Sequence, residues 1–207
     1  MNEFIKFLLL SVCAYLLGSI PFGFIIGKVN KVDVLQIGSK SASSTNVSRA
    51  LGWRWATVSA LLDFSKGLLP AYLARVNLSN QWFVIIVAIL PMVGQVFPVF
   101  LHFRGGKGAS AYYGAISGLI GLHYFLIFFP ALPIVLLITR RMSLSNIIFS
   151  WWLTLGIAIL TLLVKTPKFP LSYAIFSLLG ALFMILAMRE NIDRLVKGKE
   201  PETPLKW

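Results

Sequence analysis

The membrane topology of this chain depends on residues 111–138, which read AYYGAISGLIGLHYFLIFFPALPIVLLI. This stretch carries no Asp, Glu, Lys or Arg, and an apolar helix needs roughly 20 residues to cross the hydrocarbon core of a bilayer, which is about 30 Å thick. The stretch therefore forms either one long span or a hairpin of two short helices. His123 and Pro130 lie near the point where a hairpin would bend. Gly114 and Gly118, four residues apart, predict a helix face that packs closely against another helix.

The positions of Lys and Arg choose between these two possibilities, because cytoplasmic loops carry an excess of both residues. The hairpin places most of them on one side of the membrane: Lys28, Lys31, Lys40, Arg49, Arg54, Arg104, Lys107, Arg140, Arg141, Arg189, Arg194, Lys197, Lys199 and Lys206. The other side keeps Lys6, Arg75, Lys165 and Lys168. A single span would divide these residues equally between the two sides. We therefore predict an all-α integral membrane protein with seven transmembrane helices, its N-terminus outside and its C-terminus cytoplasmic.

The remainder of the chain is also strongly apolar. Of its 207 residues, 57% are hydrophobic and 13% are charged, which is typical of an integral membrane protein and not of a soluble domain. Further apolar stretches of spanning length cover residues 4–27, 53–76, 82–101, 146–164 and 169–188. We expect a single membrane domain over residues 1–207. No A-x-A cleavage site follows the first stretch, so we expect it to be retained as a helix.

Charge and cysteine content exclude several kinds of site. The net charge of +12 reports topology in a membrane chain, so no nucleic-acid partner is expected. Cys13 is the only cysteine, which rules out a disulfide or a thiolate metal site within the chain. His102 and His123 lack metal-ligand spacing, and no metal site is predicted. Asp63 and Lys66, spaced i,i+3 in an apolar stretch, predict either a structural ion pair or a functional pair.

Polar residues gather in segments on the side predicted to be cytoplasmic. These segments are QIGSKSASSTNVSRALG (36–52), FRGGKGASAYYG (103–114), TRRMSLSN (139–146) and RENIDRLVKGKEP (189–201). In the second, Gly105, Gly106 and Gly108 allow backbone N–H groups to approach an anion, while Lys107 supplies a positive charge. In the first, hydroxyl donors accompany Arg49, whose guanidinium can bind a phosphate through two hydrogen bonds.

Each of these segments also has a purely structural interpretation. The four could be a flexible Ser-rich linker, a tight turn beside the membrane, topological anchors and an interfacial amphipathic helix end. No side-chain general base and no nucleotide-binding motif stands out. Taken together, the segments predict a cationic, hydroxyl-rich site that is reached from the lipid.

Six motifs in the same order along the chain resemble the bacterial acyl-phosphate:glycerol-3-phosphate acyltransferases, the PlsY family. They are GSIPFG (18–23), the stretch from Gly38 through TNVSRALG (38–52), LDFSKG (62–67), FPVFLHFRGGKG (97–108), SLSN (143–146) and RENIDRLVKGKEP (189–201). The resemblance implies an enzyme that moves a fatty acyl group from acyl phosphate to the 1-position of glycerol 3-phosphate, which gives lysophosphatidic acid and phosphate. It implies neither acyl-CoA nor a metal or other cofactor.

The resemblance also implies roles for individual residues. Those matched to catalysis are Ser39, Arg49, Lys107 and Asn191. Those matched to phosphate binding are Thr45, Asn46, Gly105, Gly106 and Ser143. The implied partners are acyl phosphate, glycerol 3-phosphate and membrane lipids, and the implied location is the bacterial cytoplasmic membrane. We expect a multi-pass monomer that acts in phospholipid synthesis.

The chain departs from the family pattern at several positions. Where the family has a GSGNxG run, this chain has Lys40, Ser41 and Ser43 in place of glycine, asparagine and glycine. Gln95 and Met188 stand where the family usually has histidine. These changes leave open a divergent paralogue that acts on another phosphorylated acceptor or is catalytically silent. A small anion transporter is a further alternative, although the helices show no clear inverted repeat.

Overall fold

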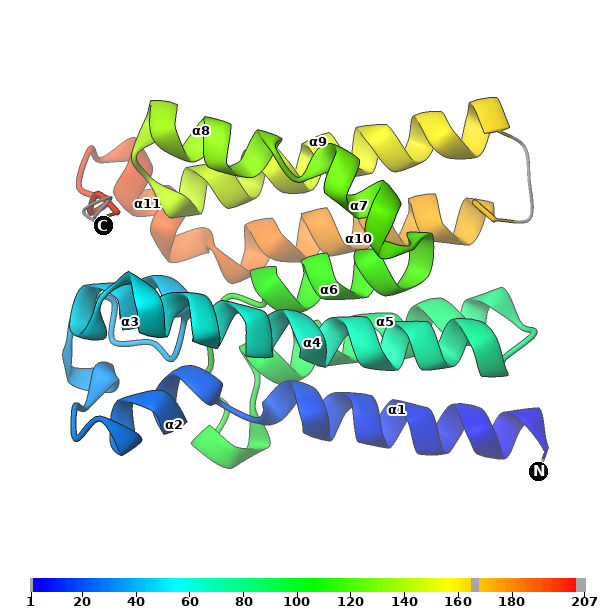
Figure 1. Ribbon diagram of the computed structural model, residues 1–207, viewed down its shortest axis with the longest axis horizontal. Helices are drawn as coiled ribbons and strands as arrows, with labels where there is room; N and C mark the ends of the chain where they lie inside the picture. Colours follow the sequence, from blue (N-terminus) through cyan, green and yellow to red (C-terminus); the bar gives the residue numbers. More distant parts are fainter. Residues whose placement is uncertain (1, 165–167, 204–207) are drawn as a thin grey trace.

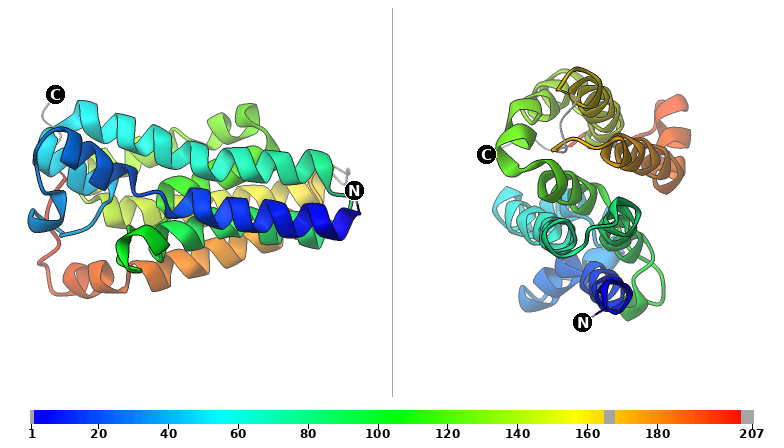
Figure 2. Two further views of the ribbon diagram at one scale, coloured as in Figure 1. Left: turned by 90° about the horizontal axis from the view of Figure 1, so that it is seen from below. Right: turned by 90° about the vertical axis from the view of Figure 1, so that its right-hand side faces the viewer.

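The computed structural model describes residues 2–164 and 168–203, and these residues form helices without any strand. Lys165 and Lys206, which entered the topology prediction, lie outside the described residues. The helices pack side by side as one bundle (Figures 1 and 2). In chain order they are α1 (Glu3–Ser19), α2 (Phe22–Val29), the 3₁₀ turn η1 (Val34–Gln36), α3 (Ser44–Leu51), α4 (Trp53–Asn77), α5 (Gln81–Val96), the 3₁₀ turn η2 (Val99–Leu101), α6 (Ala109–Ile120), α7 (Leu122–Phe128), α8 (Ala131–Thr139), α9 (Met142–Val164), α10 (Leu171–Ala187) and α11 (Arg189–Val196).

The stretch 111–138 folds as the predicted hairpin. Helix α6 runs toward one end of the molecule, and α7 followed by α8 returns toward the other (Figure 1). The reversal occurs at Gly121, whose φ of 95° lies in the left-handed region that favours glycine. The turn is therefore close to His123. Pro130 is not at the turn; it lies farther along the chain, between α7 and α8.

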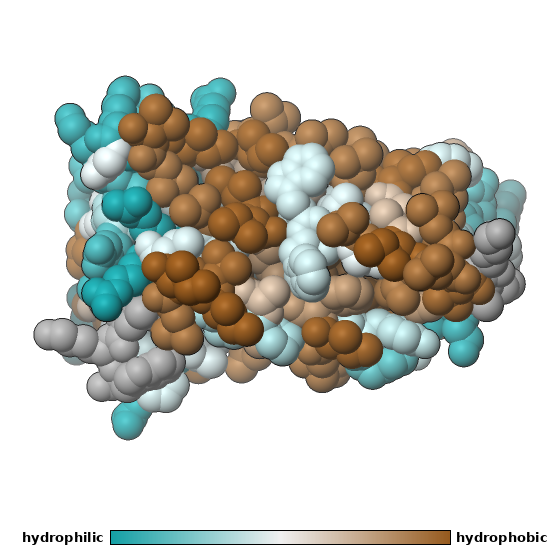
Figure 3. Space-filling view, turned by 90° about the horizontal axis from the view of Figure 1, so that it is seen from above, coloured by the Kyte–Doolittle hydropathy of each residue, from teal (hydrophilic) through white to brown (hydrophobic). Residues whose placement is uncertain are grey.

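By length and apolarity, four helical stretches among the described residues could cross a membrane: Glu3–Val29, Gln81–Leu101, Leu122–Thr139 and Met142–Val164. The bent pair α10–α11, with an angle of 63°, raises the number to five. Helix α4 carries Asp63 and Lys66 in its middle, and α6 has only 12 residues. On the face shown in Figure 3, apolar residues dominate the middle of the molecule, with some residues of intermediate hydropathy among them, and hydrophilic residues lie toward the two ends.

Close backbone contacts hold α6 against α4. A side chain at Gly114 would collide with the carbonyl of Phe64, and one at Gly118 would collide with Leu68. This confirms the predicted small-residue face. On the opposite side of α6, the Tyr112 hydroxyl donates to the Ser177 carbonyl of α10 at 2.7 Å. Helix α6 thus joins the N-terminal helices to the C-terminal pair α9–α10.

The first turn of α1 and helix α11 lie at opposite ends of the bundle (Figure 1). The end that carries α11 also carries α3 and the loop between α2 and α3 (Figure 1). The polar segments that are distant in sequence therefore meet at one end of the molecule.

Candidate functional site

A cavity of about 700 Å³ lies at this end, between the N-terminal and C-terminal helices. Its polar part is lined by Ser39, Lys40, Ser41, Ser43, Thr45, Arg49, Lys107, Ser143, Asn146, Asn191, Arg194 and Glu200. Its apolar part, between α4 and the α7–α8 run, is lined by Ala60, Leu61, Phe64, Leu122, Phe125, Leu126, Phe129 and Leu132. Leu61, Leu122 and Leu126 are at least half exposed on the outer surface of the bundle. The cavity thus joins a cationic, hydroxyl-rich end to an apolar end that opens to the side.

Most of the site residues proposed from the sequence line this cavity. Those that do so are Ser39, Thr45, Arg49, Lys107, Ser143 and Asn191. Asn46, Gly105 and Gly106 are not among its lining residues. Their contacts show what they do instead.

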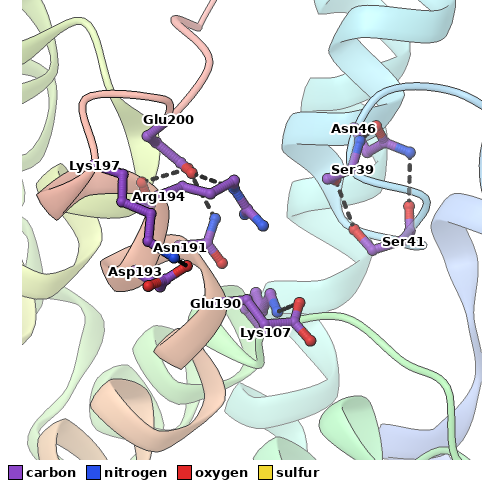
Figure 4. A network of polar contacts seen from close by, with 11 residues as sticks. Ser39, Ser41, Asn46, Lys107, Glu190, Asn191, Asp193, Arg194, Lys197 and Glu200 are labelled. Carbon is purple, nitrogen blue, oxygen red and sulfur yellow. Dashed lines mark hydrogen bonds and ion pairs between the residues drawn. The ribbon is translucent and has the colours of Figure 1, made fainter.

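Asn46 holds together the part of the loop between α2 and α3 that carries Ser39, Ser41 and Ser43, which we call the serine-rich loop. Asn46 is fully buried, and its Nδ2 donates to the carbonyls of Val34 and Ser41 at 2.7 and 2.9 Å. Its Oδ1 accepts a hydrogen bond from the Ser39 N–H at 3.0 Å. Because the whole amide is used, Asn46 shapes the loop that presents Ser39 (Figure 4).

The hydroxyls of this loop form a chain that leads to helix α3. Ser39 Oγ lies 3.0 Å from Ser41 Oγ, which lies 3.0 Å from Ser43 Oγ. Ser43 is the N-cap of α3 and accepts a hydrogen bond from the Asn46 N–H at 3.3 Å. Serine therefore gives this position a side-chain cap that the glycine of the family pattern would lack. The helix that it caps carries Arg49.

Lys40 stands at a position whose backbone conformation favours the glycine of the family pattern. Its φ of 51° lies in the left-handed region, which glycine adopts more easily than lysine. The chain adopts this left-handed conformation with a lysine at some cost in strain, and the lysine adds a cation to the cavity lining. From the sequence, Lys40 was predicted to be a cation on the cytoplasmic side and a departure from the family pattern.

Gly105 and Gly106 secure the loop that carries Lys107. The Gly106 N–H donates to the Gln95 carbonyl at 2.9 Å, and a side chain at Gly105 would collide with that same carbonyl. Lys107 itself points into the cavity, with its Nζ 3.7 Å from the carboxylate of Glu190 on α11. Figure 4 shows this pair between the serine-rich loop and the tail.

The tail contributes Glu200, a residue that the sequence analysis did not propose. Its side chain is almost fully buried, and its carboxylate accepts hydrogen bonds from Ser143 Oγ at 2.7 Å, Asn191 Nδ2 at 2.8 Å and Arg194 Nε at 2.8 Å. Burial alone would raise the pKa of Glu200, but these donors and the charge of Arg194 outweigh it and hold the pKa below its ordinary value. Glu200 thereby ties α9 to α11 at the cavity wall (Figure 4).

Arg49 faces this cluster across the cavity. Burial is the main cause that lowers the pKa of its guanidinium; Arg194 lowers it further and Glu200 partly restores it. Its Nε is buried and, among the residues that the structure describes, has no hydrogen-bond partner. A buried donor without a partner gains most from an incoming anion.

The two positions that lack the family's histidine also line the cavity. Gln95 and Met188 are both buried, and Met188 stands at the bend between α10 and α11. His102 and His123 are not among the lining residues. The described lining of this cavity therefore contains no imidazole.

The family model described as "Glycerol-3-phosphate acyltransferase" matches residues 8–198. The chain belongs to this family. Glycerol-3-phosphate acyltransferase of Aquifex aeolicus is 36% identical over 201 residues, which cover 94% of this chain and 98% of the relative. The enzyme of the same name from Ehrlichia canis is 37% identical, covering 97% and 98%. The family resemblance seen in the sequence is thus confirmed.

Solved structures of the family have the same fold. The crystal structure of PlsY (YgiH), an integral membrane glycerol 3-phosphate acyltransferase, in its glycerol 3-phosphate form matches with a TM-score of 0.87 and 30% identity, covering 96% of each chain. Its lysophosphatidic acid form matches with a TM-score of 0.85 and 31% identity, covering 95% of each chain. The protein is accordingly an integral membrane protein.

Proposed function

We propose that this protein transfers a fatty acyl group from an acyl phosphate to the 1-hydroxyl of glycerol 3-phosphate, giving lysophosphatidic acid and inorganic phosphate for phospholipid synthesis. The observation that carries the proposal is the single cavity, which joins a cationic end to an apolar end open to lipid. One reactant is a water-soluble phosphate ester and the other carries an acyl chain. A site for both needs these two environments next to each other.

The cationic end suits two phosphate groups held close together. Among the described lining residues, Lys40, Arg49, Lys107 and Arg194 outnumber the carboxylates of Asp63 and Glu200. We assign Arg49 and Lys107 to direct phosphate contact. Within the described part of the chain, Arg49 Nε has no hydrogen-bond partner, and Lys107 Nζ has only the 3.7 Å ion pair with Glu190.

Uncharged donors complete the phosphate site. We propose that Ser39, Thr45 and the second N–H of Asn191 donate further hydrogen bonds to the phosphates. Ser143 has a single O–H, which it donates to Glu200, so in this proposal it binds phosphate by turning that O–H away from Glu200. In this proposal Asn46, Gly105 and Gly106 act through the loops that they hold, as their contacts with Ser39 and Gln95 suggest.

The transfer itself needs no protein-bound intermediate. The oxygen of the 1-hydroxyl attacks the acyl carbonyl carbon, the bond from that carbon to the phosphate oxygen breaks, and inorganic phosphate leaves. A phosphate oxygen of a substrate accepts the hydroxyl proton, which suits a described cavity lining without an imidazole. Cations and hydroxyls around the carbonyl stabilise the negative charge that develops on its oxygen, and positioning of the two substrates supplies much of the rate.

The apolar end would hold the acyl chain. Leu61, Leu122 and Leu126 border it and are also exposed to the lipid, so the chain can enter between α4 and α7 without leaving the membrane. Aromatic side chains at Phe64, Phe125 and Phe129 complete its walls. The carbonyl is thereby presented to the phosphate-binding end.

We further propose seven membrane crossings, with the N-terminus outside and the C-terminus in the cytoplasm of a bacterial cell. The reversal at Gly121 and the opposite placement of α1 and α11 support an odd number of crossings. The cations of the cavity then face the cytoplasm, in agreement with the positive-inside rule. One membrane domain over residues 1–207, acting as a monomer, suffices for this site.

The test is turnover by the purified protein in detergent, with acyl phosphate and radiolabelled glycerol 3-phosphate. Formation of labelled lysophosphatidic acid supports the proposal. Labelled product with a different phosphorylated acceptor, or none with either, would replace it with the divergent or silent paralogue. Replacement of Arg49 with Ala is the matched loss-of-function control.

A further inference from the structure

The first membrane segment is interrupted between α1 and α2, at Ile20 and Pro21. In an unbroken helix the Phe22 N–H would donate to the Gly18 carbonyl, but here it donates to the Ile20 carbonyl at 3.1 Å. The Gly18 carbonyl is therefore left without its helical partner at membrane depth. A backbone group in this position needs another donor.

Lys66 of α4 supplies that donor. Its side chain is only 1% exposed, and its Nζ donates to the Gly18 carbonyl at 3.1 Å and to the Ile20 carbonyl at 2.8 Å. The ammonium lies 2.7 Å from the Asp63 carboxylate and 5.3 Å from the centre of the Phe22 ring. The buried charge is thus compensated, and Lys66 clamps the two halves of the broken segment.

The clamp lies directly behind the phosphate-binding loops. Helix α2, which begins after the break, packs on the serine-rich loop so closely that a side chain at Gly23 would collide with the Ala42 carbonyl. The lining of a second, small cavity includes Ile20, Ala42, Asp63, Lys66, Gly105 and Gly106. Asp63 and Gln95 line both this cavity and the large one. The clamp therefore borders the serine-rich loop and the loop of Lys107.

We propose that Lys66 is a positioning residue for phosphate binding: by clamping the break between α1 and α2 it fixes the distance between the serine-rich loop and Lys107. The inference rests on the proposed phosphate-binding role of the large cavity. It differs from a purely structural ion pair, which would matter for stability and leave the affinity for phosphate unchanged.

The experiment compares Lys66→Met with the double variant Asp63→Asn/Lys66→Met. The single variant leaves an unpaired carboxylate buried and should lower the Tm by roughly 10 °C. The double variant leaves no unpaired charge and has the same net charge as the native protein, so its Tm should recover most of this loss. Neither variant has the ammonium clamp. In both, we expect the Kd for inorganic phosphate and for glycerol 3-phosphate, titrated through ligand-induced Tm shifts, to rise roughly tenfold.

Arg75 provides a control, because it also lies on α4 and also binds backbone carbonyls of a different helix. Its Nη1 donates to the α6 carbonyls of Leu119 at 3.0 Å and Gly118 at 3.5 Å. Arg75 does not line the phosphate-binding cavity. Arg75→Met should lower the Tm by a few degrees and leave both Kd values within about twofold.

The outcomes separate the two proposals. A double variant that recovers both the Tm and the native Kd would overturn the positioning role. A weakened Kd in Arg75→Met as large as that in the double variant would also overturn it. If the native protein itself shows no Tm shift with either phosphate ligand, the proposed function fails first and the inference falls with it.

Discussion

Replacement of Glu200 with Ala tests how the tail is held against the cavity. The change removes the acceptor of three hydrogen bonds, from Ser143, Asn191 and Arg194. A hydrogen bond to a charged group contributes about 1.5 kcal/mol at the low end, and this applies to the two uncharged donors. Arg194 is one-third exposed, so solvent screens its ion pair to no more than about 1 kcal/mol. The expected loss of stability is therefore about 4 kcal/mol.

For a chain of this length, that loss corresponds to a fall in Tm of roughly 10 °C, measured by thermal unfolding in detergent. Glu202→Ala is the matched control, because Glu202 is an exposed carboxylate two residues away in the same tail. The control should keep the native Tm within about 1 °C. If Glu200→Ala unfolds at the same temperature as Glu202→Ala, the hydrogen bonds of Glu200 do not hold the tail in place.

The remaining predictions concern pH and the loop that carries Gly105, Gly106 and Lys107. Because the folded-state pKa of Glu200 is lowered, its stabilisation is complete above about pH 5 and is lost as the pH falls through the folded pKa, so the Tm gap between native protein and Glu200→Gln should close on acidification. A gap that is equal at pH 7 and pH 3.5 would contradict this. Lys107→Ala should raise the KM for glycerol 3-phosphate roughly ten- to hundredfold, with Lys107→Arg as the charge-preserving control. Gly105→Ala should raise the same KM roughly tenfold because its methyl group meets the Gln95 carbonyl, whereas the nearest atom to a methyl group at Gly106 is 3.9 Å away and Gly106→Ala should change the KM less than about threefold. Equal effects at the two glycines would show that the packing against Gln95 is unimportant.

Local chemistry and charge made much of the fold predictable. The distribution of Lys and Arg favoured a hairpin over residues 111–138, and the chain does reverse there, at Gly121. The small-residue spacing of Gly114 and Gly118 predicted close helix packing, which α4 and α6 show. The charge signal is readable because it depends only on which loops carry Lys and Arg, and the packing signal because it depends on two glycines four residues apart in the sequence.

The lining of the candidate site was predictable only where the local sequence is itself distinctive. Arg49 and Lys107 line the cavity, as their charges and their hydroxyl- or glycine-rich surroundings suggested. Asn46 and Glu200 could not be placed in this way, because the partners of Asn46 include Val34 and those of Glu200 include Ser143, residues that only the folded chain brings together. The clamp by Lys66 also escaped prediction, since its acceptors arise from a break in a different helix.

The sideways opening of the cavity between α4 and α7 has a consequence for contacts between a bound ligand and the lipid bilayer. In the proposed reaction, an acyl chain in that opening would touch neighbouring lipids on one side and protein on the other, because Leu61 and Leu126 line the cavity and are also exposed on the outer surface. Lipid molecules would then form part of the wall around the acyl chain. The lysophosphatidic acid of the proposed reaction could then move directly into the surrounding leaflet, so the thickness and order of that leaflet would influence the reaction.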